Sequence, residues 1–472
     1  MDPLYFTLVV LVVYMTALKS ISFFAHKRAR PDSEDYFLSG RGLGAIALLG
    51  TTAASLMSTG TVISTPANFY KFGIEFTWIL FFGITSLMIL AFGPRLWSLG
   101  KSKGYLTPGE MMGDITQSRR VQWAIAIAGI TCLLPYAAAQ LVAVGKTFSS
   151  LTGGAISYEW GLTIAAICMA AYLFFGGARA VVWTDVIQGF IFVVLLIISA
   201  FLVVQWAGGW QPMIDNLMIA HPEKAQYQST SLSFLEKILV YPALFCLPYV
   251  WQRMYMAKHP QQIRDTALFM PLVYFVVVVA CWIIGTGALV ILPELASEDL
   301  LIGAIFREYA PYFGAIVLVA AFSAGLSSVD SQLLSAASVI TRDFGTKHRS
   351  AQKEFQAARL WTLVILVCVY GVSLALESTP VIGLILIAFG LGAVMVPALF
   401  ASVMIPGVPE AAIFWSVVAG YLVCIFKVLI PEWFPTDAGP VLWAYVGAGL
   451  GFGVGYFKDL IGRKIGVIPY AD

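Results

Sequence analysis

Charged residues are scarce in this sequence. Only 11% of its 472 residues are charged and 59% are hydrophobic, whereas about a quarter of the residues in soluble globular proteins are charged. The mean hydropathy of +0.84 points in the same direction. We therefore predict an all-α, polytopic membrane protein that lies in the lipid bilayer of the cell membrane, the plasma or inner membrane.

Long polar stretches are also missing. The longest one, 207–236, has about thirty residues, whereas a soluble domain needs about 100. This excludes a kinase, nucleotide-binding or extracellular domain, so a single transmembrane domain over 1–472 is expected. The net charge of +2 argues neither for nor against nucleic acid, because charge in membrane proteins mostly reports topology. We expect neither a nucleic acid partner nor an obligate protein partner.

Histidine and cysteine are few. The four histidines, at positions 26, 221, 259 and 348, all lie between the apolar runs, which excludes a histidine proton relay through the membrane. The six cysteines lie inside apolar runs and lack the CxxC spacing of a metal or redox site. We interpret them as small packing residues.

Apolar runs of membrane length dominate what is present. We predict thirteen of them, at 4–24, 44–69, 74–99, 121–148, 157–175, 181–206, 233–255, 267–292, 312–340, 358–376, 381–404, 410–430 and 440–457. With the N-terminus outside and the C-terminus inside, all but six of the 28 lysines and arginines fall on the inner side. Arg253 belongs to this inner group. The positive-inside rule therefore selects an odd number of helices in this orientation.

Two of these runs contain helix breakers. Gly60 and Pro66 interrupt the second run, and Pro242 and Pro248 interrupt the seventh. The two runs lie five apart, as expected for two five-helix repeats whose first helices are both broken. Unwound backbone frees N–H and C=O groups for a solute or an ion, so matched breaks indicate a site near the membrane midplane. Ordinary proline-kinked helices are the alternative.

Polar groups concentrate in one further run. The stretch 323–343 places seven hydroxyls and Asp330 in what must be a membrane helix, and Asp185 is the other acid well inside a run. A carboxylate there costs about 3 kcal/mol or more unless it is paired or binds an ion. We expect no basic partner for either acid within the membrane, so bound Na⁺ or a proton would neutralise them. Structural hydrogen bonding is the alternative for any single serine.

Three motifs resemble the sodium/solute symporter family, which includes bacterial transporters of proline, pantothenate, sialic acid and galactose. They are DYFLSGRGLG at 35–44, GGARAVVWTDVIQG at 176–189 and SSVDSQLLSAASVITRD at 327–343. The resemblance implies a LeuT-like fold with two inverted five-helix repeats. The repeats would cover 44–206 and 233–404, with an extra N-terminal helix at 4–24 and two C-terminal helices within 410–457.

The resemblance also implies a function and an ion site. The function would be Na⁺-coupled symport of a small organic solute by alternating access, without the covalent chemistry of an enzyme. The family's principal sodium site falls on the carbonyls of Ala54, Met57 and Ala324 and the hydroxyls of Ser327 and Ser328. All five positions carry suitable residues.

The two membrane acids, Asp185 and Asp330, have several possible roles. Some family members hold a second sodium ion with the aspartate that corresponds to Asp185, which could instead carry a proton or be structural. Leu56 stands where the proline transporter has an acid. Asp330 has no role in the principal site of the family and is a candidate helper or inner-gate residue.

The resemblance places the solute pocket on three core helices. Its residues would be Ser58, Thr59, Thr61, Tyr136, Gln140, Tyr241, Phe245 and Tyr249. Val240 and Leu244 stand where the proline transporter has aromatic residues, which speaks against proline. With no lysine or arginine at the midplane, hydroxyls and half-helix N-termini would hold a carboxylate. Core packing is the alternative for each aromatic residue.

The predicted solute is a small carboxylate such as an amino acid, pantothenate or a monocarboxylate, with a sugar as the alternative. A proton-coupled symporter, an ion channel and a transporter-like solute sensor that acts through a partner protein are the other functions that the residues leave open.

Overall fold

The computed structural model describes residues 2–26, 33–227, 229–292, 294–345, 351–435 and 438–464. Within these ranges every regular element is a helix, and the only β-bridge is an isolated parallel one between Leu43 and Ala257. The all-α prediction is therefore confirmed. Several basic residues used in the topology prediction, Lys27, Arg28, Arg30, Lys347 and Arg349, lie outside the described ranges.

The first half of the chain forms nine α-helices. They are α1 (Pro3–His26), α2 (Ser33–Leu38), α3 (Ala45–Leu56), α4 (Thr65–Phe72), α5 (Gly83–Lys103), α6 (Pro108–Ile115), α7 (Arg119–Leu151), α8 (Tyr158–Trp206) and α9 (Trp210–Ala220). Short helical turns join them. These are η1 (Ser39–Arg41), the π-helical η2 (Gly60–Ser64), η3 (Gly73–Phe82) and η4 (Pro222–Ala225).

The second half forms ten more. They are α10 (Ser231–Cys246), α11 (Pro248–Met256), α12 (Pro260–Ile291), α13 (Leu301–Tyr309), α14 (Pro311–Asp343), α15 (Ala351–Ala375), α16 (Val381–Ala393), α17 (Met395–Met404), α18 (Glu410–Leu429) and α19 (Pro440–Lys464). The turns η5 (Glu298–Leu300) and η6 (Pro431–Trp433) complete the described elements.

Every predicted apolar run coincides with one of these helices or with a pair of them. By length and apolarity alone, ten helices among the described residues can cross a membrane, or eleven if the bent pair α10 and α11 counts as one span. Two shorter apolar helices, Ala45–Leu56 and Tyr158–Ala170, match the remaining predicted runs. The multi-pass class is confirmed, while the count of thirteen and the orientation with the N-terminus outside stay predictions.

Both predicted helix breaks are present. Helix α3 ends at Leu56, and Met57 leaves helical geometry with φ −88° and ψ 89° before η2 and α4 resume the path. Helices α10 and α11 meet at Leu247, which is extended, with an angle of 51° between the two helices. The first break thus lies just ahead of Gly60, which begins the π-helical turn, and Pro66 lies within the first turn of α4.

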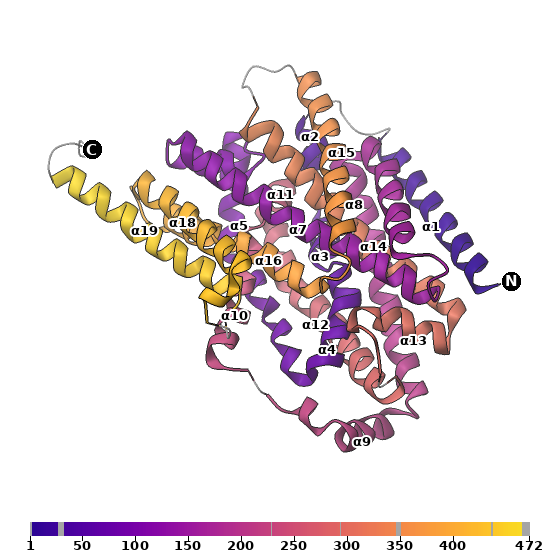
Figure 1. Cartoon of the computed structure of the whole chain (residues 1–472). Coiled ribbons are helices and arrows are strands. Elements are labelled where there is room, and N and C mark those ends of the chain that lie inside the picture. Colours follow the sequence, from indigo (N-terminus) through magenta and orange to yellow (C-terminus); the bar gives the residue numbers. More distant parts are fainter. Residues whose placement is uncertain are drawn as a thin grey trace.

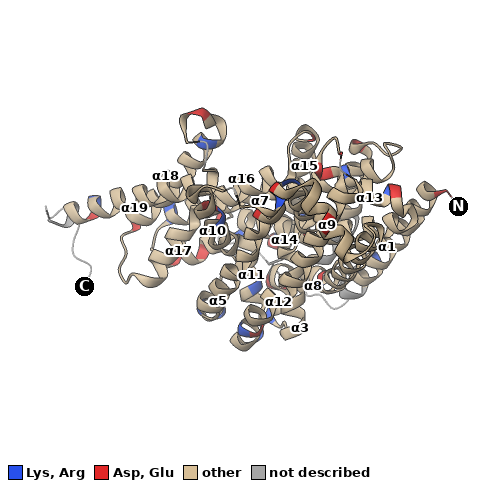
Figure 2. Ribbon diagram, turned by 90° about the horizontal axis from the view of Figure 1, so that it is seen from below, with Lys and Arg blue, Asp and Glu red and all other residues tan. Residues whose placement is uncertain are grey.

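Helix α14 lies at the centre of the bundle. It packs against α1, α3, α7, α8 and α15, and 83% of its most apolar window is buried, against 22% for α1. In Figure 1, α1 lies at one side of the molecule and the paired α18 and α19 at the opposite side. Figure 2 shows that long stretches of helix carry no charged residue. The hydroxyl-rich segment is therefore enclosed by protein and shielded from lipid.

Helix α8 contains the junction between two predicted runs. Gly177 interrupts it with φ +57° and ψ −170°, and an added Cβ would lie 2.7 Å from Cδ2 of Tyr36. A side chain at this left-handed conformation costs about 1–2 kcal/mol. Forcing it into a packed contact adds about 1–3 kcal/mol.

We therefore expect Gly177→Ala to lower the free energy of unfolding by about 2–5 kcal/mol, measured as a lower thermal midpoint of the purified protein in detergent. Gly371→Ala in α15 is the matched control, because a Cβ there meets nothing within 4 Å and alanine favours a helix. Equal midpoints for the two variants would contradict this account of the junction.

Candidate ion and solute site

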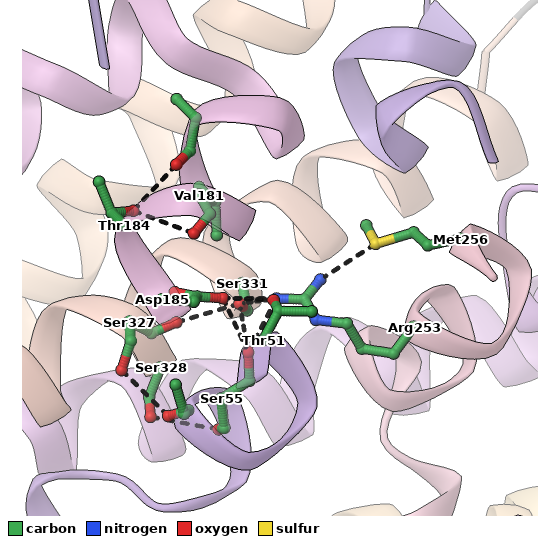
Figure 3. Close-up of polar contacts among 12 residues, drawn as sticks. Thr51, Ser55, Val181, Thr184, Asp185, Arg253, Met256, Ser327, Ser328 and Ser331 are labelled. Carbon is green, nitrogen blue, oxygen red and sulfur yellow. Dashed lines mark hydrogen bonds and ion pairs between the residues drawn. The ribbon is translucent and has the colours of Figure 1, made fainter. Parts of the chain in front are cut away.

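The end of α3 faces α14 through a set of oxygen atoms. The Ser327 hydroxyl donates to the carbonyl of Ala54 at 3.0 Å and to that of Ala324 at 3.1 Å, and the Ser328 hydroxyl donates to the carbonyl of Ser55 at 3.2 Å. Because the helix stops, the last carbonyls of α3 lack their usual backbone donors. The serine hydroxyls replace those donors (Figure 3).

Four of the five residues predicted for the principal sodium site therefore lie side by side. The fifth, Met57, is fully buried and is the first residue beyond α3. Carbonyl and hydroxyl oxygens are hard ligands of the kind that suit a hard cation. The described residues contain no cluster of three or more His, Cys, Asp or Glu side chains that could hold a metal.

Asp185 on α8 has a basic partner, contrary to the expectation from sequence. The Nη2 atom of Arg253 lies 3.3 Å from Oδ2 of Asp185, and the two side chains are 3% and 0% exposed. The same carboxylate oxygen accepts the hydroxyl of Thr51 at 2.5 Å. The Arg253 guanidinium therefore neutralises this acid. Because the pair is buried, removing one partner costs about 3–5 kcal/mol of stability.

Arg253 also binds two serines. Its Nη2 atom donates to the hydroxyl of Ser55 at 2.8 Å and to that of Ser331 on α14. Sequence reasoning assigned Arg253 to the inner surface because it lies near the end of a predicted run. The bend at Leu247 and the length of the side chain turn the guanidinium toward the protein centre. The available signal was a charge within the apolar segment PYVWQRMYM, where no other charge occurs.

Asp330 lies in α14, directly before Ser331. It is fully buried and precedes the serine that the guanidinium of Arg253 contacts. Asp185, Arg253 and Ser331 thus form a buried cluster next to the oxygen set of Ser327 and Ser328.

A cavity of about 70 Å³ adjoins this cluster. It lies between the broken helix, η3, α7, α10, α12 and α16. Its lining consists of Leu56, Ser58, Gly60, Thr61, Ser64, Thr65, Asn68, Phe76, Trp78, Ile79, Phe82, Tyr136, Val240, Tyr241, Leu244, Tyr274, Ile382, Ile385, Leu386 and Phe389. No charged side chain belongs to this set, so the cavity is neutral, and seven of its twenty lining residues are aromatic.

Half of the residues predicted for the solute pocket line this cavity. They are Ser58, Thr61, Tyr136 and Tyr241. The other four lie outside the lining and are buried elsewhere. An added Cβ on Gly325 of α14 would lie 2.5 Å from Oγ1 of Thr59. The amide of Gln140 donates to the Tyr136 carbonyl at 3.1 Å.

The two remaining residues are aromatic and make ring contacts. The ring of Phe245 lies 6.1 Å from that of Phe92, and the ring of Tyr249 lies 6.5 Å from that of Tyr136. Sequence reasoning missed Asn68 and Trp78, which do line the cavity. Asn68 offered a signal as an amide just after Pro66, whereas nothing distinguishes Trp78 from other aromatic residues of the runs.

A second cavity, also of about 70 Å³, shares Asn68 and Ile382 with the first. Two lysines line it, and each is paired with one of two consecutive acids. Lys146 lies 2.9 Å from Asp299 in a buried pair, and Lys71 lies 3.0 Å from Glu298 in an exposed one. These pairs join η5 to α7 and to α4, and they cover one end of the solute cavity.

Comparisons with known proteins identify the family of this chain. The model of the sodium:solute symporter family matches residues 36–420. The sodium/pantothenate symporter of Escherichia coli K12 is 27% identical over 80% of this chain and 81% of its own length. The sodium/proline symporter of the same organism is 27% identical over 84% of this chain and 82% of its own.

A solved structure of a Na⁺-coupled sialic acid symporter, in a substrate-bound outward-open state, has a TM-score of 0.79 at 17% identity and covers 97% of each chain. This likeness supports the LeuT-like fold that the resemblance to the family implied. Because the family model covers most of the sequence, the chain belongs to the sodium:solute symporter family and is a multi-pass membrane transporter that couples a small solute to Na⁺.

Proposed function

We propose that Ala54, Met57, Ala324, Ser327 and Ser328 hold the coupling Na⁺, and that a small carboxylate occupies the neutral cavity beside it. The observation that carries the ion site is the pair of hydrogen bonds from Ser327 and Ser328 to the last carbonyls of α3. When Na⁺ binds, these hydroxyls turn their lone pairs toward the ion. The carbonyl oxygens then lose the hydrogen bonds from the serines and contact the cation instead.

The proposed ion site and the cavity are separated by very few covalent bonds of the backbone. Met57 is proposed to hold the ion through its carbonyl, and the next residue, Ser58, lines the cavity. Fixing α3 against α14 therefore also fixes one wall of the solute pocket. Each Na⁺ that enters down a potential of about 100 mV supplies roughly 2.3 kcal/mol, in addition to its concentration gradient.

Several features favour a small carboxylate as the solute. Hydroxyls and an amide from the broken helix line one side of the cavity, at Ser58, Thr61 and Asn68. The start of the resumed helix carries partial positive charge from its N–H groups, which suits a carboxylate in a site without lysine or arginine. Pantothenate, proline and sialic acid, the solutes named for the relatives, are all carboxylic acids.

Cavity size narrows the choice further. A volume of about 70 Å³ is well below the roughly 300–1,000 Å³ of sites for drug-sized ligands, so we favour an amino acid or a monocarboxylate over pantothenate. A sugar is the second candidate, because the aromatic rings of Trp78, Tyr136 and Tyr241 line the cavity and could stack on a sugar ring.

The transport cycle follows from the positions of the two sites. In the proposed orientation, with the N-terminus outside, the pairs Lys146 with Asp299 and Lys71 with Glu298 close the outer side of the cavity. Opening to the inside requires α3, α4, α10 and α11 to move against α7 and α14. The moving helices come from both proposed repeats, 44–206 and 233–404, and we propose a cycle with no enzymatic step and no obligate protein partner.

Loss of one ligand should weaken Na⁺ binding. We expect Ser328→Ala to raise the Na⁺ concentration for half-maximal binding about tenfold, since about 1.4 kcal/mol corresponds to a factor of ten. The measurement is equilibrium binding of ²²Na⁺ to the purified transporter at constant ionic strength. Ser335→Ala is the matched control, because Ser335 is buried on the same helix and its hydroxyl has no partner among the described residues. An unchanged Na⁺ requirement in Ser328→Ala would remove this residue from the site.

The solute class can be tested by thermal stability, because ligand binding stabilises the folded state. We expect amino acids or monocarboxylates to raise the unfolding midpoint in NaCl but not in choline chloride, and sugars to leave it unchanged. If sugars raised the unfolding midpoint and carboxylates did not, a sugar would become the favoured solute.

Two neighbouring threonines provide matched variants for the same assay. Thr61→Val, which changes the cavity lining, should abolish the shift caused by the solute. Thr59→Val should retain that shift, because Thr59 lies outside the lining.

A further inference from the structure

Arg253 connects four helices at one buried point. It extends from α11 and reaches Ser55 of α3, Asp185 of α8 and Ser331 of α14 (Figure 3). A single nitrogen, Nη2, makes all three contacts. The guanidinium therefore lies where a cation bound to Asp185 would otherwise lie, at the edge of the oxygen set formed by Ser327 and Ser328.

The charge of this cluster constrains what else can bind. A guanidinium stays protonated under all ordinary conditions, so Arg253 supplies one permanent positive charge to Asp185. A Na⁺ ion on the same carboxylate would lie within a few ångströms of that charge, in surroundings that exclude water. Repulsion between like charges is strong in such surroundings, because the effective dielectric constant is low.

The ligands of Asp185 give a second argument. Its Oδ2 atom already accepts Thr51 and Arg253, and lies 3.4 Å from the hydroxyl of Ser55. Its Oδ1 atom has no hydrogen-bond partner among the described residues. One carboxylate oxygen is thus taken up by donors, and the other is available to a cation only if the neighbouring guanidinium charge is removed.

We infer that Arg253 is a tethered cation that permanently occupies the Asp185 position, so that this transporter binds a single Na⁺, at the α3–α14 site. This inference rests on the proposed function, because it takes Ser327 and Ser328 as ligands of that one ion. Asp185 thereby serves as a positioning residue, since it holds the guanidinium that connects α11 to α3 and α14.

The test counts bound Na⁺ by ²²Na⁺ equilibrium binding, with Na⁺ as the only ligand, on purified full-length protein. Wild type should bind one Na⁺ per chain. Arg253→Met leaves Asp185 without its partner and should bind two. Arg253→Met combined with Asp185→Asn removes both charges and should bind one, as should Arg253→Lys, which keeps the positive charge. Thermal unfolding of each variant checks that it is folded.

The outcomes separate this inference from the proposed sodium site. Two Na⁺ ions bound to wild type would overturn the inference without any variant, so it stays testable if Arg253→Met fails to fold. A folded Arg253→Met protein that binds one ion would also overturn it. If wild type and the variant that combines Arg253→Met with Asp185→Asn each bind one ion with an affinity that Ser328→Ala leaves unchanged, the α3–α14 assignment fails instead.

Discussion

The backbone carbonyls at the end of α3 impose the constraint on which the rest of the site depends. A helix that stops inside a membrane protein leaves carbonyls with no water to satisfy them, and each unsatisfied group costs several kcal/mol. Here α14 supplies the missing donors through Ser327 and Ser328. Such a contact holds the two helices in register, yet a cation can replace it, because the same oxygens can turn toward an ion.

Buried charge imposes the second constraint. Asp185 and Arg253 are both almost fully enclosed, and neither could remain there alone at an acceptable free energy. Their pairing ties α11, the second half of one broken helix, to α8, and the hydrogen bond from Arg253 to Ser55 ties α11 to α3, the first half of the other. The contacts of the Arg253 guanidinium therefore connect the two helix breaks. Any rearrangement of the core helices must either preserve these contacts or break them.

Much of this arrangement could be predicted from the sequence, and the failures have physical causes. The hydroxyl-rich run and the two breaks are local signals, because proline, glycine and serine act on the backbone beside them. The partner of Asp185 could not be predicted, since the position of Arg253 near the end of a run does not reveal which way a long side chain turns. The 51° bend between α10 and α11 decides that direction, and bend angles depend on packing.

The solute residues illustrate the same limit on a finer scale. Ser58, Thr61 and Thr65 line the cavity while Thr59 does not, although all four lie in one short segment. The π-helical turn from Gly60 to Ser64 widens the helix and changes the angle between successive side chains. A prediction that assumes regular helical spacing therefore cannot assign each hydroxyl to the ion or to the solute.

Coupling in this transporter follows from how few bonds separate the two ligands. Linkage requires that if Na⁺ strengthens solute binding by some factor, the solute strengthens Na⁺ binding by the same factor. Ala54 and Ser55 make their contacts with α14 just before the helix ends, and Leu56 and Ser58 line the cavity. When this segment moves toward Na⁺ it must therefore also move the groups that contact the solute, and the reverse holds as well. Because Arg253 holds both Ser55 of α3 and Ser331 of α14, we propose that the displacement is confined to the unwound residues between Ser55 and Gly60, and that this confinement makes the two binding events interdependent.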